Sequence, residues 1–295
     1  MNLSVIIPTY NRQEHLEKCL SSVFTQTVLP SEIVIIDDGI LPVDYIQDIE
    51  MRMESLGIEL AYYKKDHSVE RRGLSESKNI AISIAKESVL LFLDDDIILE
   101  KDFIQCIGEV WENSDDAWLI GVGGKITNNR IQTRWEKLFH TFFGLRSKTP
   151  WDITDVGFQT WDEQIEHKTR AYYTHGGLCS LYKDYMKHIP FSTFSGGRTG
   201  LEDVDFCLRA KQQGYHFIYE PRARASHDHN NYQGESSFQS GKKETVNRKL
   251  IFKHHSTKNV INYMRFFWST SGWILRQFLA GHFQKGMGML AGLFL

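Results

Sequence analysis

The sequence has few cysteines, few prolines and no long apolar run. Its 295 residues include 6 prolines and no repeated or single-residue-rich tract, which excludes collagen-like, solenoid and disordered chains. The longest charge-free apolar stretches of the tail, 266–275 and 286–295, each have ten residues. A membrane-spanning helix needs about 20. We therefore expect no transmembrane helix.

The cysteines and the N-terminus predict a cytoplasmic protein. The 4 cysteines are far apart and form no CxxC pair, so neither a zinc knuckle nor a dense disulfide framework is expected. They are Cys19, Cys106, Cys179 and Cys207. The apolar segment at 3–7 is typical of a strand and lacks the basic region and cleavage site of a secretory signal.

Charge is nearly balanced overall but unevenly distributed. The net charge of −3 argues against a nucleic-acid partner bound through overall positive charge. Residues 241–295 hold nine Lys and Arg against a single acid, Glu244, so this tail carries +8 and residues 1–240 carry −11. The tail also holds nine aromatic residues, the composition of a helix in an anionic membrane interface. Alternatively, these aromatics cover the protein's own domain or a dimer partner.

Apolar β-branched runs alternate with segments of helical period, which predicts an α/β fold with a largely parallel sheet covered by helices. Strands are expected at 3–7, 33–36, 59–63, 89–93, 118–122 and 172–174. Helices are expected at 16–24, at 43–56 before Gly57, from Ser75 as N-cap, and at 201–213 before Gly214. We expect one α/β domain over 1–240, with halves at about 1–100 and about 101–240, followed by a helical extension over 241–295.

Acidic residues follow two of the expected strands. Ligands of open α/β sheets bind beyond the carboxyl ends of the strands. Asp94, Asp95 and Asp96 follow strand 89–93, and three adjacent carboxylates need a cation, water or hydrogen-bond donors to offset their charge. Such carboxylates suit Mg²⁺ or Mn²⁺, and a solvated loop is the alternative. The pair Asp37-Asp38, taken alone, is typical of a helix cap or a turn.

Five motifs stand in a fixed order along the chain. They are Pro8-Thr9-Tyr10-Asn11-Arg12, Asp37-Asp38-Gly39, Gly73-Leu74-Ser75 with Lys78-Asn79, Phe92-Leu93-Asp94-Asp95-Asp96, and Leu201-Glu202-Asp203-Val204-Asp205-Phe206 with Arg209. In order and approximate spacing, residues 3–230 resemble the family 2 glycosyltransferases. The resemblance implies a single Rossmann-like nucleotide-diphosphosugar transferase domain of GT-A type, with a mixed, mostly parallel sheet. Residues 1–240 would be this catalytic domain, with the nucleotide-sugar half at about 1–100 and the acceptor half at about 101–240. It also implies inversion at the anomeric carbon and a divalent cation, Mn²⁺ or Mg²⁺, at an Asp-x-Asp element.

The resemblance also implies roles for single residues at the donor site. Asp96 matches the metal ligand, and Asp94 matches the ribose-proximal position with Asp95 between them. Asp37 or Asp38 would meet the base or ribose, and Lys78 takes the place of a basic residue near the nucleotide. The wall of the nucleotide pocket would be Pro8, Thr9, Tyr10, Asn11 and Arg12.

The remaining candidates lie in the second half of the chain. Glu202 and Asp203 open a helix after a Gly-rich loop at 195–200, where the helix dipole favours carboxylates, although simple capping is an alternative. By resemblance Asp203 is the catalytic base and Glu202 orients the acceptor or the base. His227 is expected as a metal or diphosphate ligand, and its imidazole favours Mn²⁺ over Mg²⁺. His175 either borders the donor sugar or belongs to a turn, and Arg198 is a further candidate for phosphate.

These features predict transfer of a sugar from a nucleotide diphosphate sugar, with UDP as the expected nucleotide, to a hydroxyl of a glycan or lipid-linked acceptor. Cell-surface polysaccharide synthesis is the implied setting, with the protein cytoplasmic or peripheral on the inner face of the membrane. No Gln-x-x-Arg-Trp element follows the catalytic helix, so we expect a non-processive enzyme. Two alternatives are a sugar-nucleotide nucleotidyltransferase, which would need a Gly-rich loop after the first strand, and a non-catalytic carbohydrate-binding or scaffold protein.

Overall fold

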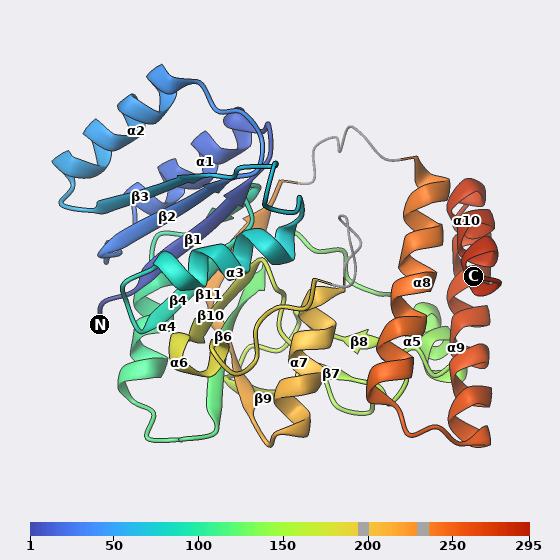
Figure 1. The fold of residues 1–295 in the computed structure, drawn as a ribbon. Coiled ribbons are helices and arrows are strands. Elements are labelled where there is room, and N and C mark those ends of the chain that lie inside the picture. The colour runs from blue at the N-terminus through green and yellow to red at the C-terminus, as the bar shows by residue number, and fades with distance from the viewer. Residues whose placement is uncertain (194–200, 229–235) are drawn as a thin grey trace.

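A computed structural model describes residues 1–193, 201–228 and 236–295 (Figure 1). The first hundred residues alternate strands and helices, as the apolar periodicity predicts. These elements are β1 (Ser4–Thr9), α1 (Gln13–Phe24), β2 (Glu32–Asp37), α2 (Val43–Ser55), β3 (Glu59–Lys64), α3 (Leu74–Ile84), β4 (Val89–Leu93) and β5 (Ile97–Leu99). The four strands expected here are confirmed.

The second half is less regular and ends in three helices. It consists of α4 (Phe103–Glu112), β6 (Leu119–Ile126), α5 (Arg134–Phe142), β7 (Asp152–Ile153), β8 (Gln159–Thr160), β9 (Thr169–Ala171), β10 (Leu178–Tyr182), α6 (Lys183–Met186), α7 (Glu202–Gln212), β11 (His216–His227), α8 (Ser237–His255), α9 (Val260–Leu279) and α10 (Phe283–Leu293). The Gly-rich loop at 195–200, with the candidate Arg198, lies outside the described residues.

The central sheet is mixed, and its order explains where the site forms. The strand order is β3-β2-β1-β4-β10-β6-β11-β5, with β9 paired to β11. Strands β1 to β4 pair in parallel, whereas β10 runs antiparallel to both β4 and β6. The carboxyl ends of β1, β2 and β4 therefore meet at one edge, which is where α/β sheets bind ligands.

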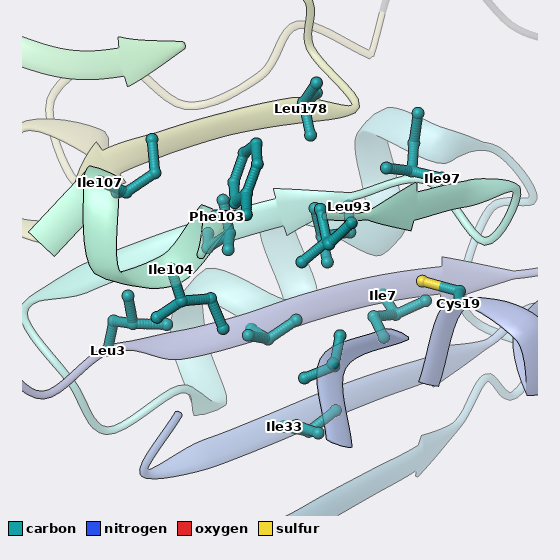
Figure 2. Close-up of a cluster of buried hydrophobic side chains, with 14 of the residues drawn as sticks. Leu3, Ile7, Cys19, Ile33, Leu93, Ile97, Phe103, Ile104, Ile107 and Leu178 are labelled. Atoms are coloured by element: carbon teal, nitrogen blue, oxygen red, sulfur yellow. The ribbon is translucent and has the colours of Figure 1, made fainter. Parts of the chain in front are cut away.

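The sheet buries apolar side chains on both faces. Alternate residues of β1, such as Val5 and Ile6, enter different clusters because successive side chains of a strand point to opposite faces. One cluster packs under α1, α2 and α4, and Figure 2 shows part of it, with Leu3, Ile7 and Phe103 among its members. The other packs against α3 and α7. Burial on both faces explains why these strands appear in the sequence as continuous apolar runs.

Of the local predictions, the two helix-ending glycines are confirmed, whereas an N-cap and a strand are wrong. Gly57 and Gly214, which follow α2 and α7, have φ of 72° and 89°, left-handed values that suit glycine after a helix. Ser75 is not the N-cap of α3, because the helix already begins at Leu74 and Ser75 lies buried in its first turn. The strand expected at 172–174 is wrong as well. The chain pairs earlier, in β9, and then leaves the sheet.

The three C-terminal helices pack together at one side of the molecule (Figure 1). A Cβ atom at Gly288 of α10 would lie 1.9 Å from the carbonyl oxygen of Phe238 in α8, so glycine permits this close packing. Helix α8 also joins the body of the protein. Ile251 is fully buried in the core beside α7, and His255 Nε2 lies 2.7 Å from Asp205 Oδ1. Within the described ranges, no helix has the length and apolarity to cross a membrane.

Some aromatic residues of the tail pack inside the protein, and others are exposed to solvent. Phe252 and Phe266 are buried and stack on each other with ring centroids 4.6 Å apart. Phe267, Trp268 and others remain exposed. The tail therefore covers part of the protein's own domain and also presents apolar side chains to solvent.

Candidate active site

Residues after β1 and β4 form a closely bonded acidic cluster. The Thr9 hydroxyl donates to Asp95 Oδ2 over 2.8 Å. The Arg12 guanidinium forks between two carboxylates, with Nη1 2.6 Å from Asp95 Oδ1 and Nη2 2.7 Å from Asp96 Oδ2. Burial raises the pKa of Asp95 to about 7, against the lowering effect of Arg12 and Thr9. Asp95 thus anchors the cluster to the loop after β1.

Asp96 and His227 meet because of the strand register. His227 pairs with Ile97 where β11 runs antiparallel to β5, and the backbone N–H of Asp228 donates to the carbonyl of Asp96 over 2.8 Å. His227 Nε2 lies 3.0 Å from Asp96 Oδ1. Burial by itself raises the pKa of Asp96, but bonds from His227 and Arg12 outweigh burial and hold the pKa well below its ordinary value.

This pair fits a divalent cation by its donor chemistry. A carboxylate oxygen and an imidazole nitrogen already face each other on two adjacent strand ends. Among the residues that the structure describes, no group of three His, Cys, Asp or Glu could hold a metal ion. Two protein ligands are what Mg²⁺- and Mn²⁺-dependent sites use when substrate phosphates and water complete the coordination. The residues are therefore compatible with Mn²⁺ or Mg²⁺.

Two glycines allow the chain before β10 to press against Asp94 and Asp203. A Cβ atom at Gly177 would lie 2.1 Å from Asp94 Oδ2, and one at Gly176 would lie 2.8 Å from the Cβ of Asp203. The backbone N–H of Asp94 donates to the carbonyl of Gly177 over 3.0 Å. Burial raises the pKa of Asp94, while Lys78 opposes the shift. The loop at 176–177 thus brings the acids of β4 and α7 close to each other.

The first turn of α7 presents the other two acids. Lys78 Nζ, from α3, lies 3.1 Å from Glu202 Oε1 and also donates to the carbonyl of Gly176 over 3.1 Å. The Tyr173 hydroxyl donates to Asp203 Oδ2 over 3.0 Å, and the N–H of Val204 donates to Asp203 Oδ1 over 2.8 Å. Burial raises the pKa of Asp203, Glu202 adds to the rise and Lys78 opposes it. Lys78, expected near the nucleotide, is buried against this acidic pair.

The carboxylates of Asp37 and Asp38 differ in how fully their oxygens are hydrogen-bonded by the protein. Asp37 is fully buried and accepts four hydrogen bonds, from the N–H groups of Gly39 and Leu41, the Tyr62 hydroxyl and Lys64 Nζ. These bonds fix the turn after β2. Asp38 accepts from the N–H of Gly73 over 2.9 Å and pairs with Lys65 Nζ at 3.0 Å, which leaves lone pairs for a further donor. Asp38 is the better placed of the two to meet a ligand.

The other residues of the motif at 8–12 lie in different environments. Pro8 is buried within β1. Asn11 adopts φ of 52°, and its Oδ1 accepts the N–H of Ile40 over 2.8 Å, which ties the loop to the turn after β2. Tyr10 is 45% exposed, with the Arg72 guanidinium 5.6 Å from the centre of its ring. The Tyr10 ring and the Arg72 guanidinium therefore lie at the surface, in contact with each other.

A cavity of about 540 Å³ joins the acids to the C-terminal helices. Asp94, Glu202, Asp203 and His227 line it. Residues of α5, α8, α9 and α10 and Arg146 line it as well. His175, also in its wall, lies 3.3 Å from Glu163 Oε1, with its ring edge-on to Trp151 and Trp161. The expected nucleotide residues at 8–12 and 37–38 do not line this cavity.

The comparisons place the chain in a known family. The sequence profile of glycosyl transferase family 2 matches residues 4–174, more than half of the chain, so the chain belongs to that family and is a glycosyltransferase. The family predicted by the motifs is confirmed. The glucosyl-dolichyl phosphate glucuronosyltransferase of Haloferax volcanii is 27% identical over 236 residues, which cover 77% of this chain and 69% of that protein.

Solved structures agree with the fold. A mannosyltransferase from Pyrobaculum calidifontis, in complex with GDP-Man and Mn²⁺, has a TM-score of 0.57 at 14% identity and covers 95% of this chain and 75% of its own. TarS 1–349 from S. aureus, in complex with UDP-GlcNAc, has a TM-score of 0.55 at 15% identity, with 90% and 70% covered. The expected GT-A fold, with its mixed sheet and helical C-terminal region, is confirmed.

Substitution of Lys78 tests the charge balance around Asp203. If Asp203 is a catalytic base, it must be ionised to act, so activity would fall as the pH drops through its pKa. In Lys78→Met, Asp203 keeps Glu202 and the Tyr173 hydroxyl as neighbours but loses its cation, so its pKa rises further. We expect the acid limb of the pH profile of donor hydrolysis to move to higher pH, and Lys78→Arg to restore it in part.

The control is Lys86→Met, because Lys86 is an exposed lysine that pairs with Glu59. Its pH profile should match that of the unmodified protein. A folded Lys78→Met protein with an unshifted acid limb would show that Lys78 does not set the ionisation of Asp203.

Proposed function

We propose that the protein transfers a sugar from a nucleotide diphosphate sugar, with UDP as nucleotide, to a hydroxyl of a glycan or lipid-linked acceptor, with inversion and non-processively. The observation that carries this proposal is the convergence of Asp94, Glu202, Asp203 and His227 on one cavity. We also propose cell-surface polysaccharide synthesis as the setting, with 1–240 as catalytic domain and 241–295 as extension.

In this proposal Asp96 and His227 hold Mn²⁺ or Mg²⁺. The cation would neutralise charge that grows on the diphosphate as the sugar–phosphate bond breaks. The 3.0 Å approach of the two side chains supports this assignment, as does the Mn²⁺ bound by the Pyrobaculum mannosyltransferase. Thr9 and Arg12, through Asp95, would hold the acidic turn in place.

Asp203 is proposed to take the proton from the acceptor hydroxyl. Inversion by a single displacement requires the base on the face of the sugar opposite the leaving group. Tyr173 and the N–H of Val204 fix the carboxylate, and burial keeps it more basic than an exposed aspartate. Glu202, held by Lys78, would orient the acceptor.

We expect UDP to bind more tightly than GDP when Mn²⁺ is present. Asp38 retains lone pairs that can accept the N–H of uracil, although guanine also carries N–H donors. The S. aureus neighbour binds UDP-GlcNAc, whereas the Pyrobaculum neighbour binds GDP-Man. Direct competition of the two nucleotides in calorimetry decides the question, and tighter binding of GDP would contradict the assignment.

A panel of nucleotide sugars, screened by thermal shift with Mn²⁺, tests the proposed donor class. One or a few sugars with a common nucleotide should raise the melting temperature, and EDTA should remove the effect. Stabilisation by nucleoside triphosphates together with sugar 1-phosphates would favour the nucleotidyltransferase alternative. Stabilisation by free glycans without any nucleotide would favour a carbohydrate-binding protein.

We also propose that the protein attaches peripherally to the inner face of an anionic membrane. Helices α5 and α9 carry adjacent exposed apolar side chains, joined where Trp268 Nε1 donates to the carbonyl of Phe142 over 2.8 Å. The exposed set is Trp135, Leu138, Phe142, Val260, Ile261, Met264, Phe267, Trp268, Leu275 and Leu279. Exposed Lys253, Lys258 and Arg265 flank it. Apolar and basic residues together are what an interfacial helix presents to anionic lipid.

Point substitutions test this attachment better than truncation, because removing the tail would take Ile251 out of the core. The triple change Leu138→Ser, Phe142→Ser and Met264→Ser should weaken binding to phosphatidylglycerol vesicles by about tenfold or more, since it removes several kcal/mol of apolar contact. Vesicle co-sedimentation measures the effect. The control is Ile40→Ser with Val69→Ser, which removes exposed apolar residues of the other half. Equal binding by both variants would rule out this face.

A further inference from the structure

The cavity is lined by charged residues of both signs. Asp94, Glu202 and Asp203 are among its acids. Its wall also carries six cationic residues, and the acids Asp162, Glu163 and Glu244 accompany them. The cationic residues are Arg130, Lys137, Arg146, Arg248, Arg276 and Lys285. A substrate in the cavity can therefore place a neutral hydroxyl near Asp203 and negative charge near the cationic residues of the wall.

Some of these cations are already paired. Glu244 Oε1 lies 3.2 Å from Arg248 Nη2, and Glu244 Oε2 lies 3.1 Å from Lys285 Nζ, so this buried carboxylate serves two cations. Lys137 Nζ lies 3.7 Å from Asp162 Oδ2. These three cations are held by the protein itself and are not needed for a ligand.

Arg146 and Arg276 are much less compensated. Arg146 is half-buried and makes no ion pair with any residue in the described ranges. Arg276 lies above the ring of Trp273, 4.9 Å from its centre, and Glu136, its nearest acid, is 3.9 Å away. Both guanidinium groups therefore retain N–H donors for an anion that enters the cavity.

His140 supplies an independent sign of a ligand. Its side chain lines the same cavity from α5 and is only 7% exposed, yet its Nε2 atom has no hydrogen-bond partner within the described part of the chain. Buried polar atoms are almost always paired. Burial, together with the nearby Arg276 and Arg146, lowers the pKa of His140 to about 4, so the imidazole is neutral and can donate or accept a bond.

We propose that His140, Arg146 and Arg276 form a subsite that binds a phosphate group of the acceptor. The inference rests on the proposed function, because it assigns the acceptor to the same cavity as Asp203. Guanidinium groups bind phosphate through paired hydrogen bonds, and phosphate offers more acceptor oxygens than a carboxylate. Two guanidinium forks and an imidazole match that larger set of acceptors. The ring of Trp273 lies beneath the Arg276 guanidinium.

The phosphate could come from an isoprenoid-linked acceptor or from a polyol-phosphate polymer. The experiment uses calorimetry on the full chain with UDP and Mn²⁺ at saturation, so that the donor site is filled. The probes are citronellyl phosphate, glycerol 3-phosphate and citronellol. We expect at least one phosphate to bind and citronellol not to compete. Tighter binding of citronellyl phosphate indicates the isoprenoid source, and equal or tighter binding of glycerol 3-phosphate indicates the polymer.

Variants locate the site. Arg146→Gln and Arg276→Gln should each weaken binding of the phosphate probe by about tenfold, the effect of losing a hydrogen bond to a charged group. Arg134→Gln is the matched control, since Arg134 is exposed at the start of α5 and does not line the cavity. Equal affinity in all three variants, or no binding of either phosphate to the unmodified protein, overturns the subsite.

These outcomes are separable from failure of the proposed function. If the unmodified protein binds UDP with Mn²⁺ and hydrolyses a donor but ignores both phosphates, the subsite alone is wrong. If it neither binds a nucleotide nor hydrolyses a donor, the proposed function is wrong, whatever the phosphate probes do.

Discussion

The change Asp203→Asn is expected to lower sugar transfer by about 10²–10⁴-fold, the usual contribution of a general base. Asparagine keeps the size of the side chain and can still accept the N–H of Val204, which bonds to Asp203 Oδ1 over 2.8 Å. It lacks the basic lone pair that would take the acceptor proton in the proposed mechanism. Because a base contributes mainly in the transition state, affinity for the donor should be nearly unchanged. Turnover and donor affinity are measured separately, by single-turnover assay and calorimetry.

The neighbouring acid provides the internal control for Asp203. Glu202→Gln should cost less than Asp203→Asn if Glu202 only orients the acceptor, and it leaves Lys78 with one fewer negative partner. An inactive Glu202→Gln protein beside a nearly normal Asp203→Asn protein would exchange the two roles. If both variants stay active, the base lies elsewhere.

The second large effect is expected for Asp96→Ala, which should remove the metal-dependent part of nucleotide binding. A bound cation and a bound diphosphate neutralise each other, so the loss of either leaves the charge of the other uncompensated. We expect affinity for UDP in Mn²⁺ to fall by about 10²-fold or more, since a metal ion contributes several kcal/mol at phosphoryl oxygens. In EDTA the variant and the unmodified protein should bind UDP equally weakly. Calorimetry with and without Mn²⁺ gives both values.

Asp228→Ala is a matched control for Asp96→Ala. Asp228 is the next residue after β11, and it pairs with Lys18 Nζ at 2.9 Å. Its loss should leave the Mn²⁺-dependent increment intact. The role assigned to Asp96 fails if Asp96→Ala retains that increment, or if Asp228→Ala loses it to the same extent.

Much of the first half of the fold is predictable from sequence, for a physical reason. Strands β1, β2 and β4 are buried on both faces, so they appear as short apolar runs between helices with clear periodicity. The segment 172–174 has a similar aromatic and β-branched composition but serves a different purpose. The Tyr173 hydroxyl bonds to Asp203, 30 residues away in the sequence, and local composition does not record such a partner.

For the candidate site, too, some residues are predictable from the sequence and others are not. Asp94, Asp95 and Asp96 are detectable because three acids follow one apolar strand, and a family resemblance adds Asp203 and His227. The partner of Lys78 is Glu202, 124 residues further on, and no spacing rule predicts that contact. The doublet Gly176-Gly177 was the available signal for the close approach to Asp94 and Asp203. His140 and Arg146 belong to no recognisable motif, so only their position in the cavity wall makes them candidates for a ligand site.

Mn²⁺-dependent hydrolysis of nucleotide sugars, measured as release of nucleoside diphosphate across a panel of donors, tests directly whether the protein is an inverting, metal-dependent glycosyltransferase. We expect release from one or a few UDP-sugars, loss of release in EDTA, and a free sugar whose first-formed anomer is inverted relative to the donor. A folded protein that hydrolyses no nucleotide sugar in Mn²⁺, or that releases a sugar with retained configuration, would contradict it.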